Sequence, residues 1–191
     1  MRYNELTFQG RNAVLEAFRS GKTIDKLFIL DGCQDGPIKS IVREAKKTDA
    51  IINYVDKERL DRLAGTGHHQ GVVAIGAAYE YAEVDDILAA AKEKGEDPFI
   101  FILDEIEDPH NLGAIIRTAN LAGAHGVIIP KRRAVGLTAT VAKTSAGAIN
   151  YTPVAKVTNI SQTIEELKKQ GLWFVCADMG GETMYNLNLK G

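Results

Sequence analysis

The chain has 191 residues, of which 45% are hydrophobic and 25% charged, and these values are typical of a globular protein. No apolar run approaches the length needed to cross a bilayer, and the N-terminus has no apolar signal core, so we expect a soluble, cytoplasmic protein. The net charge of −2 argues against a strongly basic nucleic-acid binder. However, seven of the acidic residues lie within residues 79–98, so basic patches can persist elsewhere.

Residues 1–78 show helices alternating with strands, which is enough for a small α/β domain. The predicted helices cover residues 13–18, 38–47 and 56–63, and the predicted strands cover residues 26–30, 51–55 and 71–77. Pro37 suits the first turn of the second helix, and Gly65 closes the third. Cys33 and Cys176 lack CxxC spacing, so we expect two buried or idle thiols in a reducing compartment.

Residues 79–98 are acidic and rich in alanine, with a helix predicted over Val84–Lys94. We interpret this segment as the connection between two domains. The alternative is that its helix belongs to one continuous domain.

The alternation restarts in residues 99–191, where short apolar strands separated by helices predict a mostly parallel sheet covered on both faces. The predicted strands cover residues 99–103, 127–129, 152–155 and 172–177, and the predicted helices cover residues 111–122, 138–146 and 161–170. Ser161 is the candidate N-cap of the last helix. In open α/β sheets ligands bind beyond the carboxyl ends of the strands, so the loop after strand 99–103 is a candidate site.

The helix after that loop carries two candidate functional residues, Asn111 at its start and Arg117 about two turns further on. Asn111 can cap free backbone amides. The guanidinium of Arg117 can hold a phosphate or stabilise developing oxyanion charge. The alternative is that Arg117 pairs with an acidic residue of the preceding turn, such as Glu105 or Asp108.

Two further polar segments are candidates for RNA contacts. His68, His69 and Gln70 lie in a glycine-flanked loop, where they could stack on a base or bind phosphate, with loop solvation as the alternative. Lys131, Arg132 and Arg133 follow a strand and could contact phosphate, although surface solubility explains them equally well. The acidic cluster at residues 104–108 could bind a divalent metal ion, but favourable charge at the N-terminus of the next helix explains it more simply.

The segment Asp108–Asn120, followed by Gly123–Pro130, closely resembles the first signature of the SpoU (TrmH) family of ribose 2′-O-methyltransferases. Thr138–Asn150 resembles the segment that follows this signature in the family. Gly10–Val14 and His69–Val72 resemble the small N-terminal domain of the subgroup that methylates a guanosine of bacterial 23S ribosomal RNA. The match covers nearly the whole chain.

The resemblance implies an α/β protein with an RNA-binding domain in residues 1–78, an acidic linker in residues 79–98 and a knotted SPOUT-type methyltransferase domain in residues 99–191. It also implies S-adenosylmethionine as the cofactor, ribosomal RNA as the partner, a homodimer and no metal. A transfer RNA ribose methyltransferase and a non-catalytic RNA-binding module remain as alternatives.

In the family, Asn111 would help build the active site and Arg117 would act on the ribose hydroxyl. Because a guanidinium rarely loses its proton, we expect Arg117 to orient and stabilise, while a phosphate or water takes the proton. The other implied contacts are Arg11, His68, His69 and Gln70 to RNA, with Lys131, Arg132 and Arg133 as further candidates, and Ala177 and Asp178 to the cofactor.

The later family signatures, which form most of the cofactor pocket and the knot, would follow Leu189 and are absent from this sequence. We therefore expect that the knot is incomplete, that the chain binds cofactor poorly and is inactive by itself, and that an apolar face is exposed.

Overall fold

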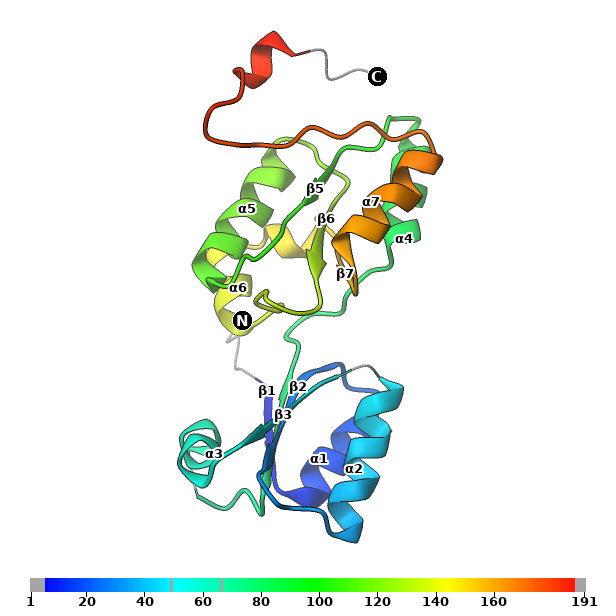
Figure 1. Cartoon of the computed structure of the whole chain (residues 1–191). Helices are drawn as coiled ribbons and strands as arrows, with labels where there is room; N and C mark the ends of the chain where they lie inside the picture. Colours follow the sequence, from blue (N-terminus) through cyan, green and yellow to red (C-terminus); the bar gives the residue numbers. More distant parts are fainter. Residues whose placement is uncertain (1–5, 49, 66, 188–191) are drawn as a thin grey trace.

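A computed structural model describes residues 6–48, 50–65 and 67–187. The expectations about a signal segment and about the chain end concern residues 1–5 and 189–191, which lie outside this part. The elements form two β-sheets, each with helices on both faces (Figure 1). Among the described helices, none has the length and apolar character to span a membrane.

The first unit (residues 6–76) is built on a four-stranded sheet in the order β1-β4-β2-β3. Its strands are β1 (Leu6–Gln9), β2 (Ile24–Leu30), β3 (Ile51–Val55) and β4 (Val72–Gly76). β2 runs parallel to β3 and antiparallel to β4, and β1 is antiparallel to β4. The central β2 and β4 are mostly buried, as the apolar runs Leu27–Leu30 and Val72–Ile75 predict.

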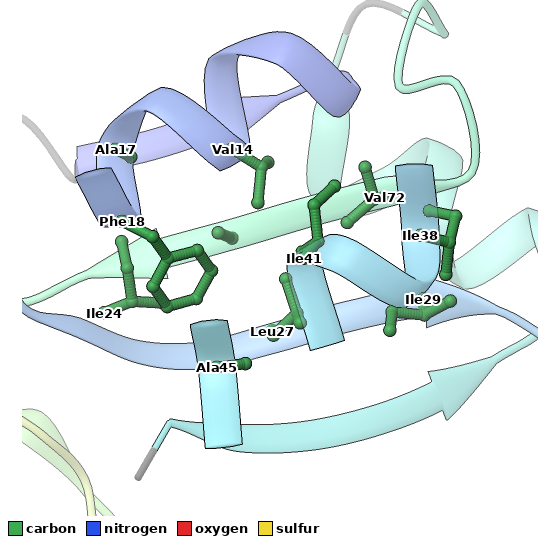
Figure 2. Packing of buried hydrophobic residues seen from close by; sticks show 11 residues of the cluster. Val14, Ala17, Phe18, Ile24, Leu27, Ile29, Ile38, Ile41, Ala45 and Val72 are labelled. Atoms are coloured by element: carbon green, nitrogen blue, oxygen red, sulfur yellow. The ribbon is translucent and has the colours of Figure 1, made fainter. Parts of the chain in front are cut away.

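Three helices cover the first sheet, namely α1 (Arg11–Arg19), α2 (Gly36–Lys47) and α3 (Lys57–Ala64). α1 and α2 lie on one face, where Phe18 and Ile41 pack with Leu27 of β2 (Figure 2). α3 covers the other face, where Leu60 packs with Phe28. Burying each such side chain contributes about 1.5–3 kcal/mol, so one sheet with two apolar faces gives the first unit its own core.

The second unit (residues 84–169) is built on the parallel sheet β5-β6-β7. Its elements are α4 (Val84–Lys94), β5 (Ile100–Ile102), α5 (Pro109–Leu121), β6 (Gly126–Pro130), α6 (Ala139–Thr144), β7 (Val154–Val157) and α7 (Ile160–Lys169), with a 3-10 turn η1 (Ala148–Asn150) after α6. α5 and α6 pack on one face of the sheet, and α4 and α7 pack on the other. The predicted parallel sheet with two covered faces is confirmed.

The acidic segment of residues 79–98 packs against the second sheet. Ile87 of α4 lies in the core with Ile128, and a Cβ added at Gly126 would lie only 2.5 Å from the Cδ1 atom of Ile87. Ala82 forms a parallel bridge with Ala155 of β7. The segment therefore connects the two sheets and also forms one layer of the second unit.

The predicted strand at residues 172–177 is wrong, since the structure has irregular backbone there. Leu172 and Phe174 pack against the α4/α7 core, whereas Trp173 and Val175 are exposed, so the side chains alternate as in a strand. The backbone nevertheless joins no ladder, and β5 pairs with β6 alone among the described strands. A 3-10 turn, η2 (Met184–Asn186), follows.

Candidate active site

Helix α5 begins two residues earlier than predicted, because Asp108 and Pro109 supply its N-terminus. The Asp108 carboxylate accepts a hydrogen bond of 2.8 Å from the backbone N–H of His110, and Pro109 occupies the first turn. Aspartate at the cap and proline just inside it are the favoured residues for these positions. Asn111 is therefore not the cap, and it lies exposed in the first turn. The last helix shows the same kind of shift, since Asn159 caps α7 in place of Ser161.

The buried side of α5 packs closely against α6. Leu112 and Ile116 are fully buried, and Gly113 meets Thr144 of α6. A Cβ at Gly113 would overlap the Thr144 hydroxyl and lie 2.8 Å from its Cβ atom, so only glycine permits this approach. With this side fixed, the helix presents Asn111 and Arg117 outward.

Arg117 is exposed and has no hydrogen bond or ion pair within the part of the chain that the structure describes. The two acids that were the alternative partners are engaged elsewhere. Glu105 pairs with Arg133 at 2.8 Å, and Asp108 caps α5. The guanidinium of Arg117 is thus available for a ligand.

The loops that follow β5 and β6 are both strained and bonded to each other. Glu105 and Arg133, which form the ion pair between the loops, have φ values of 55° and 57°. A left-handed conformation costs a non-glycine residue about 1–2 kcal/mol, and such strain gathers at functional sites. These loops lie at the carboxyl ends of parallel strands, where ligands bind in open α/β sheets.

A groove of about 970 Å³ lies between the first and second units, beside the loop after β6. The predicted residues Lys131, Arg132 and Arg133 all line it, whereas Asn111 and Arg117 do not. The complete lining, named here the basic groove, consists of Lys26, Phe28, Lys46, Ala50, Ile51, Ile52, Asn53, Arg59, Glu107, Lys131, Arg132, Arg133, Ala134, Val135 and Thr158.

Arg11 binds both Gln70 and Asp35, the N-cap of α2. The backbone N–H of Arg11 donates to Oε1 of Gln70, and its Nε donates to the Gln70 carbonyl, both at 3.1 Å. The guanidinium also pairs with Asp35 at 2.6 Å. These bonds hold the start of α1, the start of α2 and the loop before β4 together.

His69 is only 5% exposed, and both of its ring nitrogens have partners. Its Nδ1 accepts from the N–H of Gly71 at 3.0 Å, so Nε2 carries the proton and donates to Asp61 at 2.9 Å. This geometry gives His69 a structural role and leaves no ring nitrogen for an RNA group. The neighbouring His68 is exposed.

The structure also contains a buried polar cluster that the sequence did not reveal. Tyr81 donates to Asp25 of β2 at 3.0 Å and accepts from the N–H of Leu137 at 2.9 Å. Lys156 of β7 pairs with Asp25 at 2.5 Å and lies 4.6 Å from the centre of the Tyr81 ring. Asp25, Tyr81 and Lys156 are named here the junction cluster, because they join the two sheets.

Burial and the neighbouring Asp25 carboxylate raise the pKa of Tyr81 above its usual value, so the phenol stays protonated. Gly136 packs directly against Asp25 and Tyr81, and a Cβ there would lie 2.8 Å from the phenol oxygen. No local motif could have indicated this cluster, since Asp25 and Lys156 are 131 residues apart.

The two predicted cofactor contacts, Ala177 and Asp178, lie exposed in the irregular segment after α7. The Asp178 side chain accepts from the N–H of Met179 at 2.7 Å, and its carbonyl accepts from Gly180. Neither residue lines the basic groove. The described residues at this position therefore do not form an enclosed site for S-adenosylmethionine.

Two family models match this chain over separate ranges of residues. Residues 9–82 match the model described as "RNA 2'-O ribose methyltransferase substrate binding", and residues 98–191 match the "SpoU rRNA Methylase family". The chain is 54% identical to "Putative TrmH family tRNA/rRNA methyltransferase YacO" of Bacillus subtilis (strain 168), over 88% of this chain and 68% of that protein. A relative from Staphylococcus haemolyticus (strain JCSC1435) is 48% identical over 95% of this chain and 72% of its own length.

Among solved structures, the SpoU methyltransferase AviRb from Streptomyces viridochromogenes in complex with AdoMet has 19% identity and a TM-score of 0.42. That match covers 87% of this chain and 59% of the AviRb chain, so this chain spans less than two thirds of it. The identity and coverage of the curated relatives decide the assignment: the chain belongs to the SpoU/TrmH family of RNA methyltransferases.

Proposed function

We propose that this protein takes part in S-adenosylmethionine-dependent 2′-O-methylation of a ribose in RNA, with a guanosine of 23S ribosomal RNA as the favoured target. In this proposal residues 1–78 bind the RNA. Residues 99–191 carry out methyl transfer, within a knotted domain of the whole protein. The observation that carries the proposal is the exposed guanidinium of Arg117, which has no partner among the described residues and lies on the helix that follows the first strand of the parallel sheet.

Arg117 would act on the ribose side of the reaction. Among the described residues its guanidinium has no ion pair, and the two acids nearest in sequence are engaged elsewhere, since Glu105 binds Arg133 and Asp108 caps the helix. A guanidinium stays protonated at all working pH values, so it donates hydrogen bonds and stabilises the developing oxyanion but does not accept the hydroxyl proton. A phosphate of the RNA or a water would take that proton, and Asn111 would help to position the ribose.

The cofactor side is not assembled by the described residues, since Ala177 and Asp178 are exposed. We infer that the 191-residue chain by itself binds S-adenosylmethionine weakly and transfers methyl groups slowly or not at all. Tight binding of S-adenosylmethionine by this chain in a calorimeter would contradict the inference.

Methylation should be tested with unmodified 23S ribosomal RNA and bulk transfer RNA as separate substrates, because the names of the relatives include both classes. The protein would be used at the full length of its natural coding sequence, with methylated ribose mapped by mass spectrometry. Loss of the Arg117 donor in Arg117→Ala should lower the rate about 100- to 1000-fold, the cost of losing one such donor. Arg43→Ala, which removes an exposed arginine of α2, is the matched control.

The pH–rate profile separates the two roles of Arg117. An unchanged profile with a lower rate in Arg117→Ala supports charge stabilisation, whereas loss of a titrating limb would assign it the role of base. A wild-type rate for Arg117→Ala would overturn the proposed function. Methylation of transfer RNA alone would replace the ribosomal substrate, and RNA binding without any methylation would favour the non-catalytic module.

We also propose that the protein acts as a homodimer in the cytoplasm. Leu121 and Tyr151 are 82% and 81% exposed. They adjoin a hydrogen bond of 3.1 Å between Asn120 and Thr152, so both lie at the same end of α5. We expect the parent protein to sediment as a dimer and the Leu121→Lys variant to sediment as a monomer.

A further inference from the structure

We propose that the basic groove is a composite site for the RNA backbone, with one wall from each unit. This inference rests on the proposed function and specifies where its substrate would lie. The groove contains six cationic side chains and one carboxylate, Glu107, in a chain whose net charge is −2. The first unit contributes Lys26, Lys46 and Arg59, and the loop after β6 contributes Lys131, Arg132 and Arg133.

Most of this charge is not neutralised by the residues that the structure describes. Lys26, Lys46, Arg59 and Arg132 have no ion pair in the described part of the chain. Arg133 already binds Glu105, and Lys131 has an interaction of its own. Like charges collected at one surface repel each other, so a polyanion that enters the groove relieves this repulsion and releases its own counterions.

The chemistry of the lining favours a sugar–phosphate backbone over stacked bases. The neutral part of the lining includes Ile51, Ile52 and Val135, with Asn53 and Thr158 as hydrogen-bonding groups. Its one aromatic residue, Phe28, is 6% exposed and packs in the α3 core, so it offers no stacking platform. Groove binding that relies on phosphate contacts tolerates different sequences and depends steeply on salt.

The position of the groove connects it to both the junction cluster and the candidate active site. Asp25 of the cluster precedes Lys26, and Lys156 lies two residues before Thr158, so the cluster holds the two walls together. Glu107 lies just before the N-terminus of α5, the helix that carries Asn111 and Arg117. RNA held in the groove is therefore adjacent to the loop that leads into that helix.

Salt-dependent binding of a labelled oligouridylate tests the proposal. The probe would have about 20 nucleotides, longer than the ~4–16 that one single-strand-binding fold covers. The slope of log K against log salt is negative, and each lost phosphate contact lowers its magnitude by about 0.7 for a single strand. The variant Lys46→Gln/Arg59→Gln should lower that magnitude by about 1.4, Arg132→Gln by about 0.7, and the threefold variant by about 2.1.

The matched control is Lys92→Gln/Lys169→Gln, which removes two exposed cations of α4 and α7 and should keep the parental slope. Circular dichroism of each variant verifies folding. A parental slope in both groove variants overturns the proposal, and a change confined to one wall overturns its composite nature. Equal competition by polyglutamate of the same charge would assign the groove to an acidic protein instead.

The methyl-transfer assay keeps this result separate from the proposed function. If the groove variants keep the parental salt slope while Arg117→Ala still loses methylation, the RNA-binding role of the basic groove is refuted and the proposed function stands. Lowered slopes in a protein that methylates no RNA refute the proposed function and leave the groove as an RNA-binding site.

Discussion

Replacing Lys156 by methionine should destabilise the protein by about 3 kcal/mol, because it leaves a buried carboxylate without its cation. The side chains of Asp25 and Lys156 are 7% and 17% exposed, and their charged atoms lie 2.5 Å apart. Removing one partner of a buried pair costs about 3–5 kcal/mol. The lower end applies here, because Asp25 keeps its hydrogen bond of 3.0 Å from Tyr81.

For a chain of this size, such a loss lowers the melting temperature by about 6–12 °C. Urea unfolding should be followed by far-ultraviolet circular dichroism, because the single tryptophan, Trp173, is 80% exposed and reports poorly on the core. The double variant Asp25→Asn/Lys156→Met removes both charges, so it should be more stable than the sum of the single variants by about 1–3 kcal/mol. Additive losses, or a loss below about 1 kcal/mol in Lys156→Met, would refute the energetic role of the pair.

Three further predictions follow from the described contacts. The pKa of Tyr81 is raised in the folded protein, so the protonated phenol contributes fully to the free energy of unfolding below about pH 10. This contribution is lost as the pH rises further, by up to about 1.4 kcal/mol per pH unit. Tyr81→Phe should remove this alkaline dependence, which urea titrations at several pH values would measure. Gly113→Ala should cost about 1–3 kcal/mol through overpacking, whereas Gly36→Ala, with open space around it, should not destabilise the fold. His69→Ala should lower stability by about 1–3 kcal/mol through its lost buried hydrogen bonds, while His68→Ala should not, and an RNA-binding loss without a stability loss in His69→Ala would contradict the structural role.

Local sequence signals predicted most of the helices and strands. Ile51–Val55 and Val84–Lys94 have the predicted bounds, because an apolar run and a closing Gly95 are sufficient to define them. β1 was missed because four residues with two exposed positions carry no clear period, and its ladder with β4 stabilises it. The strand expected at residues 172–177 shows the converse, since correct alternation without a bonded neighbour leaves irregular backbone.

The candidate site was predictable only where chemistry follows from local spacing. Asn111 and Arg117 were located on the correct helix, although that helix begins two residues earlier than predicted, at Pro109. Whether Arg117 is free depends on Glu105, which is bound to a residue of another loop. The junction cluster and the first-unit wall of the basic groove arise from residues distant in sequence, so tertiary packing alone brings them together.

The contact between Gly113 and Thr144 has a mechanical consequence for α5. Because the Thr144 side chain lies where a Cβ of residue 113 would be, sliding or rotating one helix past the other would bring their atoms into steric clash. Opening or closing around Arg117 would therefore have to carry α5 and α6 as one rigid body. The flexing would fall instead on the residues between β5 and α5, whose amides should exchange with deuterium far sooner than those at the helix crossing.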